Sequence, residues 1–166
     1  MITNICIVGL LKKYTKSISK RVADTLDMFY ADVTELLEYE YINMANAEKI
    51  VGKEYMEKQE VKKIKALSTF ENTLFTVDTF YLNNEKNLHH IKNGALVIYL
   101  QLSQKMFDKH IKQEKLTKQE EAIVRNMAFE RDLLLKDYAD IVVDITTDKN
   151  IEKLILTKIE EYYEKW

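Results

Sequence analysis

Short apolar runs alternate along this chain with longer segments in which apolar residues recur every three or four positions. Such runs predict buried strands, and the periodic segments predict helices that pack one face against a sheet. The predicted strands are residues 5–8, 28–31, 73–77, 95–100 and 141–143. The predicted helices are residues 17–26, 35–41, 45–51, 54–67, 83–93, 103–112, 118–136 and a C-terminal helix from residue 148. Strands that alternate with helices predict a three-layer α/β/α fold, in which helices cover both faces of a five-stranded parallel sheet.

Small polar residues and glycines mark several ends of the predicted helices. Ser103 and Asp148 precede helical patterns and are expected to act as N-caps. Gly52 separates two helices, and Gly94 closes the helix before the fourth strand. Because three helices fall between the second and third strands, residues 33–70 predict a helical subdomain.

The segment from Gly9 to Ser17 joins the first predicted strand to a helix that opens at Ser17. A strand, a glycine turn and a helix in this order are typical of phosphate sites, because backbone N–H groups and the positive end of the helix dipole converge there. Asp32 follows the second strand at its carboxyl end, where open α/β sheets gather ligand groups. The pattern alone therefore favours a phosphate site at this strand–helix junction.

Composition and charge limit the classes of function. The chain has 166 residues, of which 46% are hydrophobic and 31% charged, and its formal net charge is −2. We expect a single domain over residues 1–166 that binds neither nucleic acid nor a membrane, because it has no basic field and no apolar run near the roughly 20 residues that span a bilayer. Since it shows no basic leader, we expect a cytoplasmic protein. The single cysteine, Cys6, lies in the first apolar run and is interpreted as a core residue.

Glycine and proline are rare in this chain. It contains three glycines and no proline, where ordinary usage would give about eleven and eight. Any motif that requires several glycines or a proline is therefore excluded.

The order and spacing of many residues resemble the shikimate kinases, small P-loop kinases of the nucleoside-monophosphate-kinase type. The matching residues are 5–9, 18–26 with Met28, Asp32 with 35–38, Gly52, Glu54, Tyr55, Glu60, 94–100, Arg131 and 139–144. The resemblance covers most of the chain and implies a P-loop kinase architecture, with a substrate-binding-type subdomain at residues 33–70 and a lid-type region at 109–136. For an active member it implies ATP and Mg²⁺, with phosphate transfer to shikimate in aromatic amino-acid (chorismate) biosynthesis.

The phosphate loop departs from the family's glycine-rich run, which ends in Gly-Lys-Ser-Thr. Tyr14, Thr15 and Lys16 replace the last glycine, the lysine that reaches the β- and γ-phosphates and the serine that ligates Mg²⁺. The Cβ atoms of Lys12 and Tyr14 are expected to close a cradle that needs glycines at positive φ. The loop-equivalent residues are Gly9, Lys12, Lys13, Tyr14, Thr15, Lys16 and Ser17.

The positions that match the family's substrate site also differ. Asp32, the acid associated with Mg²⁺, is kept, whereas Thr34 replaces the acid that holds the shikimate hydroxyls. Glu57 replaces a carboxylate-binding arginine and reverses the charge offered to an acidic substrate. The family's glycine triplet is replaced by Asp78, Thr79 and Phe80, which are expected to fill the substrate space. Arg131 matches a second carboxylate-binding arginine of the family and is kept.

Two local interpretations stay open from the sequence. Lys12, Lys13 and Lys16 form either a residual anion site or a solvated basic turn, the second being favoured, because cations at a helix N-terminus are unfavourable without an anion nearby. Asp32 either holds a metal-bound water or caps the helix after it, and capping is favoured.

Three functional hypotheses follow. The preferred one is a catalytically degenerate shikimate-kinase-like protein that acts as a binding, regulatory or structural module, because phosphoryl transfer depends on positioning groups that have been replaced. The second is an active shikimate kinase or a related ATP-dependent small-molecule phosphotransferase, and the third is a protein–protein interaction domain. ATP and Mg²⁺ are expected only if kinase activity is retained, and the partners considered are a small anion or an unidentified protein.

Overall fold

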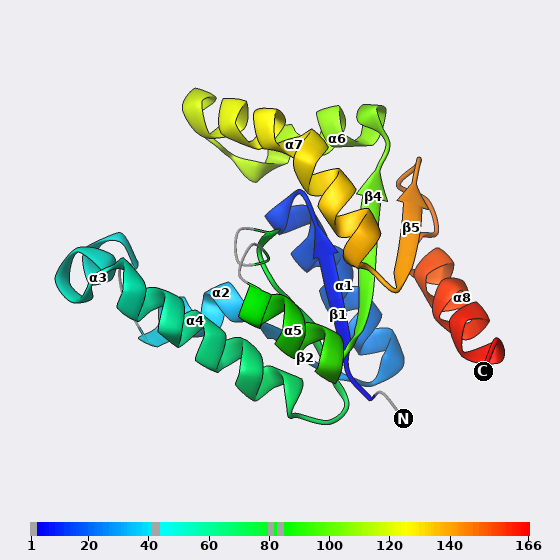
Figure 1. Cartoon of the computed structure of the whole chain (residues 1–166). Helices are drawn as coiled ribbons and strands as arrows, with labels where there is room; N and C mark the ends of the chain where they lie inside the picture. The colour runs from blue at the N-terminus through cyan, green and yellow to red at the C-terminus, as the bar shows by residue number, and fades with distance from the viewer. Residues whose placement is uncertain (1–2, 41–43, 80–81, 83–84) are drawn as a thin grey trace.

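Five parallel strands form the central layer of the computed structural model, which describes residues 3–40, 44–79, 82 and 85–166 (Figure 1). In order across the sheet they are β2 (Phe29–Asp32), β3 (Thr73–Thr76), β1 (Ile5–Gly9), β4 (Leu96–Leu102) and β5 (Ile141–Ile145). The central strand β1 pairs with β3 on one side and with β4 on the other, both in parallel. The predicted α/β fold with a five-stranded parallel sheet is confirmed.

Helices cover both faces of this sheet. They are α1 (Lys12–Leu26), α2 (Val33–Glu40), α3 (Met44–Val51), α4 (Lys53–Ser68), α5 (Glu85–Gly94), α6 (Gln104–Ile111), the 3₁₀ helix η2 (Lys112–Glu114), α7 (Lys118–Tyr138) and α8 (Ile151–Glu164). Ile5 and Ile7 of β1 pack with α1 and α8, while Cys6 and Val8 pack with α4, α5 and the end of α7. Continuous apolar runs form the strands because both faces are buried in this way.

Cys6 is fully buried on β1, as its interpretation as a core residue required. Burial raises the pKa of its thiol, because the charged thiolate would lose its hydration.

The carboxyl ends of β1 and β4 lead toward α6 and the first half of α7, which lie above the sheet in Figure 1. The helices α3 and α4 lie at the left of the same view, on the side of β2. Residues that follow β1 and β3 line a cavity together with residues of the start of α1 and of α7.

Two of the predicted helix boundaries are formed by the expected residues, a serine cap and a glycine. The Ser103 hydroxyl accepts a hydrogen bond from the Met106 N–H at 3.3 Å and caps α6. Gly52, with φ of 86°, separates α3 from α4. The predicted cap at Asp148 is wrong, because α8 begins after Asn150 and the Asp148 carboxylate binds two side chains of α6.

Gly94 ends α5 where this helix passes close to the end of α4. A Cβ atom built on Gly94 would lie 2.5 Å from the Ser68 carbonyl oxygen and 2.6 Å from the Ser68 Cβ. The helix ends where the sequence predicts, but the glycine is needed for this close approach. Among the glycines of the described residues, it is Gly52 that has the positive φ.

Two predicted helix ends, residues 41 and 83, lie outside the described residues. Within the described ranges, no helix is both long enough and apolar enough to cross a bilayer.

Candidate functional site

The connection between β1 and α1 consists of Leu10 and Leu11, because the strand ends at Gly9 and the helix begins at Lys12. Leu11 is buried and packs with Phe107 and Ile111 at the end of α6. The predicted helix start at Ser17 is therefore wrong, and α1 begins five residues earlier. Residues that carry a Cβ atom favour the right-handed helix over positive φ, so this glycine-poor stretch extends the helix.

Thr15, at the position of the family's lysine, packs against Gly9. A Cβ atom built on Gly9 would lie 2.3 Å from Thr15 Oγ1, and Thr15 itself is only 4% exposed. Gly9 thus lets the first turns of α1 lie close to the end of β1. The Thr15 side chain is directed into this junction and is covered there by protein.

The N-terminus of α1 binds a carboxylate from a distant part of the chain. Glu114 of η2 accepts hydrogen bonds from the N–H groups of Lys13 at 3.0 Å and of Tyr14 at 3.1 Å, one on each carboxylate oxygen. Glu114 is 7% exposed. Negative charge at a helix N-terminus is favourable, because it satisfies free amides and interacts with the helix dipole. Glu114 therefore caps α1 from about 100 residues away.

Glu114 is the residue that sequence reasoning missed. Its partners are backbone groups, so no side-chain motif marks the pair. The available signal was indirect, since α1 starts with basic residues and without an acid in its first turn. Such a helix needs a capping group from elsewhere, but the sequence does not say which carboxylate reaches it.

The other loop-equivalent residues lie on the first two turns of α1 and point in several directions. Lys16 forms an ion pair with Glu35 of α2. Tyr14 is partly buried, and its ring centroid lies 4.4 Å from that of His110. Burial, helped by Asp148, raises the pKa of Tyr14 to about 12. Ser17, Lys12 and Lys13 are exposed, so these residues do not form one concave phosphate cradle.

Asp32 lies at the end of β2 and binds protein groups with both carboxylate oxygens. Oδ1 accepts a hydrogen bond from the Glu35 N–H at 2.9 Å, and Oδ2 accepts one from Thr76 Oγ1 at 2.9 Å. The expected capping role of Asp32 is therefore confirmed. Among the described residues, no group of three or more His, Cys, Asp or Glu side chains is placed to hold a metal ion.

The substrate-site equivalents divide into two groups. Asp78, Thr79 and Arg131 line the same cavity as Lys12, Lys13 and Lys16. Glu57 lies on the exposed surface of α4, and its carboxylate is 4.0 Å from the Lys53 ammonium group. Thr34 is buried in the first turn of α2, and Phe80 lies outside the described residues.

This cavity, between the start of α1 and one face of α7, has a volume of about 490 Å³. Its apolar lining comes from the β1–α1 connection, the segment before α7 and α7 itself: Leu10, Leu11, Leu116, Ile123, Val124, Met127 and Ala128. Its charged lining consists of Lys12, Lys13, Lys16 and Arg131 with Asp78, Glu114 and Glu120. Both the start of α1, with the connection before it, and α7 therefore contribute apolar as well as charged groups to the lining.

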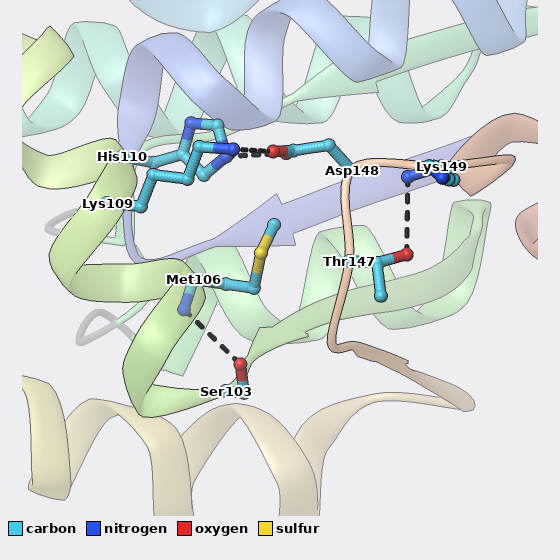
Figure 2. A network of polar contacts seen from close by, with 7 residues as sticks. All are labelled: Ser103, Met106, Lys109, His110, Thr147, Asp148 and Lys149. Carbon is cyan, nitrogen blue, oxygen red and sulfur yellow. Dashed lines mark hydrogen bonds and ion pairs between the residues drawn. The ribbon is translucent and has the colours of Figure 1, made fainter.

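A second polar cluster joins α6 to the segment before α8 (Figure 2). His110 Nε2 lies 2.6 Å from Asp148 Oδ1, and Lys109 pairs with the other carboxylate oxygen. The hydrogen bond from Lys109 holds the pKa of Asp148 below its ordinary value, and His110 adds to this effect. A cavity of about 300 Å³ lies beside the cluster and is lined by Tyr14, Ser17 and Arg21 among others.

Replacing Asp148 by asparagine is expected to destabilise the protein at pH 7 by less than about 1 kcal/mol, because the side chains of Asp148 and of its partner Lys109 are both more than a third exposed. A carboxyl group with a lowered pKa in the folded state stabilises it above the ordinary aspartate pKa, and this contribution is lost as pH falls through the folded value. The difference between wild type and Asp148→Asn should therefore shrink toward about pH 2.5. Urea unfolding at both pH values measures this, with Asp24→Asn on the exposed side of α1 as the control. A difference that grows on acidification would contradict the assignment.

Comparisons with known proteins identify the family of the chain and agree with its fold. A family model described as shikimate kinase matches residues 15–164. The match begins at Thr15, after β1 and most of the altered loop. A comparison with curated protein sequences found no match.

Several solved structures share the fold. Shikimate kinase from Aquifex aeolicus is 19% identical, with a TM-score of 0.78 over 98% of this chain and 99% of that chain. Shikimate kinase from Acinetobacter baumannii, solved in complex with shikimate, is 15% identical, with a TM-score of 0.76 over 99% and 94%. Dephospho-CoA kinase from Campylobacter jejuni is 12% identical, with a TM-score of 0.63 over 99% of each chain. At these identities the similarity establishes the architecture of a shikimate-kinase-like P-loop kinase.

Proposed function

Because the chain belongs to the shikimate kinase family, a family of P-loop phosphotransferases, we propose that it keeps the family's fold as a binding or regulatory module without phosphotransferase activity. One observation carries the proposal. The carboxylate of Glu114 already binds the amides of Lys13 and Tyr14, at the helix end where a phosphate group would be expected.

A phosphate at this helix end would have to displace the Glu114 carboxylate. If the carboxylate stayed in place, two unit charges of the same sign 4 Å apart would repel by about 4 kcal/mol near a protein surface. Displacement would also break two charge-assisted hydrogen bonds of a buried side chain. Both effects oppose nucleotide binding in this conformation.

The remaining groups also do not fit ATP and Mg²⁺. Thr15 packs on Gly9 and has no ammonium group to offer to a phosphate. Both oxygens of Asp32 accept hydrogen bonds from protein groups, so this carboxylate is already engaged.

The proposal is tested by measuring ADP release from the purified full chain with Mg-ATP and shikimate, next to an active shikimate kinase under the same conditions. Thermal shifts with each ligand are measured in parallel, since binding at 100 times Kd raises stability by about 2.7 kcal/mol. We expect no shikimate-dependent release of ADP and no shift with Mg-ATP.

Two outcomes would contradict these expectations, and the first of them would overturn the proposal. Shikimate-dependent release of ADP would identify a working kinase with an atypical loop. A thermal shift with Mg-ATP but without release would identify a nucleotide sensor, in which Glu114 yields its place to a phosphate.

A further inference from the structure

The middle of the wall that α7 contributes to the 490 Å³ cavity is apolar, with Glu120 and Arg131 toward its two ends. Ile123, Val124, Met127 and Ala128 are spaced so that they share one side of the helix, and all four line the cavity. Ile123 is 50% exposed, which leaves a large apolar side chain in contact with water. Leu10 and Leu11 lie on the opposite side of the cavity. A ligand that displaces water from these walls must itself be largely apolar.

The carboxylates around the cavity are mostly engaged by protein groups. Glu114 binds the amides of α1, and Glu120 accepts a hydrogen bond from the Thr117 N–H at 2.7 Å in the capping box of α7. Lys16 is paired with Glu35, outside the cavity lining. Protein groups therefore already bind the carboxylates of Glu114 and Glu120 and the ammonium group of Lys16.

The other cations of the lining are Lys12, Lys13 and the buried Arg131, and of these the two lysines are exposed. Across the part of the chain that the structure describes, neither ammonium group forms an ion pair with a carboxylate. Both residues lie in the first turn of α1, where the N–H groups of Lys13 and Tyr14 already bind Glu114. One anionic group on a ligand could pair with these ammonium groups without displacing Glu114 from the backbone amides.

We propose that the cavity between α1 and α7 binds a small organic monoanion, a carboxylate or sulfonate with an apolar body. The body lies against Val124 and Met127, and the anionic group pairs with Lys12 and Lys13. The volume is within the range of about 300–1,000 Å³ usual for small-molecule pockets, which are mostly apolar and have a few polar groups. The inference rests on the proposed function only in that no nucleotide occupies this space.

The test uses two forms of probe on the full chain. The fluorescent aromatic sulfonate 1-anilinonaphthalene-8-sulfonate is titrated, and decanoate and decanol are then compared as competitors. We expect saturable binding at one site, with decanoate displacing the probe at least tenfold more effectively than decanol, because only decanoate carries a charge.

Variants locate the site. Lys12→Ser combined with Lys13→Ser should weaken probe binding at least tenfold, and Val124→Asp should do the same by placing a carboxylate in the apolar wall. Lys153→Ser, an exposed lysine on α8, is the matched control and should leave binding unchanged. Circular dichroism checks the fold of each variant, and the lysine pair carries the test if Val124→Asp unfolds.

The inference is overturned by an absence of saturable binding, by unchanged binding in the lysine variant, or by displacement with Mg-ATP but not with decanoate. ADP release is measured separately from probe binding. A positive release assay with normal probe binding would therefore reject the proposed function alone.

Discussion

Replacing Glu114 by alanine is expected to lower the free energy of unfolding by about 2 to 3 kcal/mol. The substitution removes the acceptor for two backbone N–H groups and leaves them in a largely buried position. It also removes the only acid that the structure shows bonded to the first turn of α1 in the described residues. Urea unfolding followed by circular dichroism measures the change.

Two further variants separate capping from a general effect of losing a carboxylate. Glu114→Gln keeps one acceptor oxygen and should lose about 1 kcal/mol. Glu130→Ala removes an exposed carboxylate from α7 and should change stability by less than about 0.5 kcal/mol. Equal losses in Glu114→Ala and Glu130→Ala would mean that Glu114 does not cap α1.

Replacing Gly94 by alanine is expected to cost about 2 kcal/mol, although alanine is the better helix former. The new Cβ atom would lie 2.5 Å from the Ser68 carbonyl oxygen, which is backbone and cannot rotate away. The ends of α4 and α5 would have to separate, and both helices contribute buried side chains to the core on this face of the sheet. The loss is measured by urea unfolding.

Gly52→Ala is the matched control for this variant. No described atom lies within 4 Å of a Cβ atom built on Gly52, but its φ of 86° strains any other residue. We expect a smaller loss, about 1 kcal/mol, from backbone strain alone. A Gly94→Ala protein as stable as wild type would show that α4 and α5 can move apart without cost.

The sequence predicts the central strands β3, β1 and β4 well because they are buried on both faces. A strand such as β4 must then be a continuous apolar run, and residues 95–100 show this run directly. Helix starts are predicted well where the cap is local, as at Ser103. They are predicted poorly where the cap comes from elsewhere, as at α1, whose cap is the distant Glu114.

The candidate site was predictable in part. The family resemblance assigned Lys12 to the phosphate loop and Asp78 and Arg131 to the substrate site, and these three residues do line one cavity. Glu57 does not line this cavity, because it lies on the exposed surface of α4. A match between residues in two sequences does not say in which direction a side chain points. Asp148 was predicted to cap the C-terminal helix because it precedes the helical pattern. Its carboxylate instead binds His110, which lies 38 residues earlier in the chain.

The bond between Glu114 and α1 also bears on how the chain acquires its structure during synthesis. Translation delivers β1 and α1 first, whereas the capping carboxylate leaves the ribosome only after about a hundred more residues have been added. Until then the first turn of α1 has free amides and a surplus of positive charge. The cap on the N-terminal turn of α1 can therefore form only after η2 has been synthesised. In the finished protein, hydrogen exchange at the Lys13 and Tyr14 amides should report the seating of η2 rather than the stability of α1 alone.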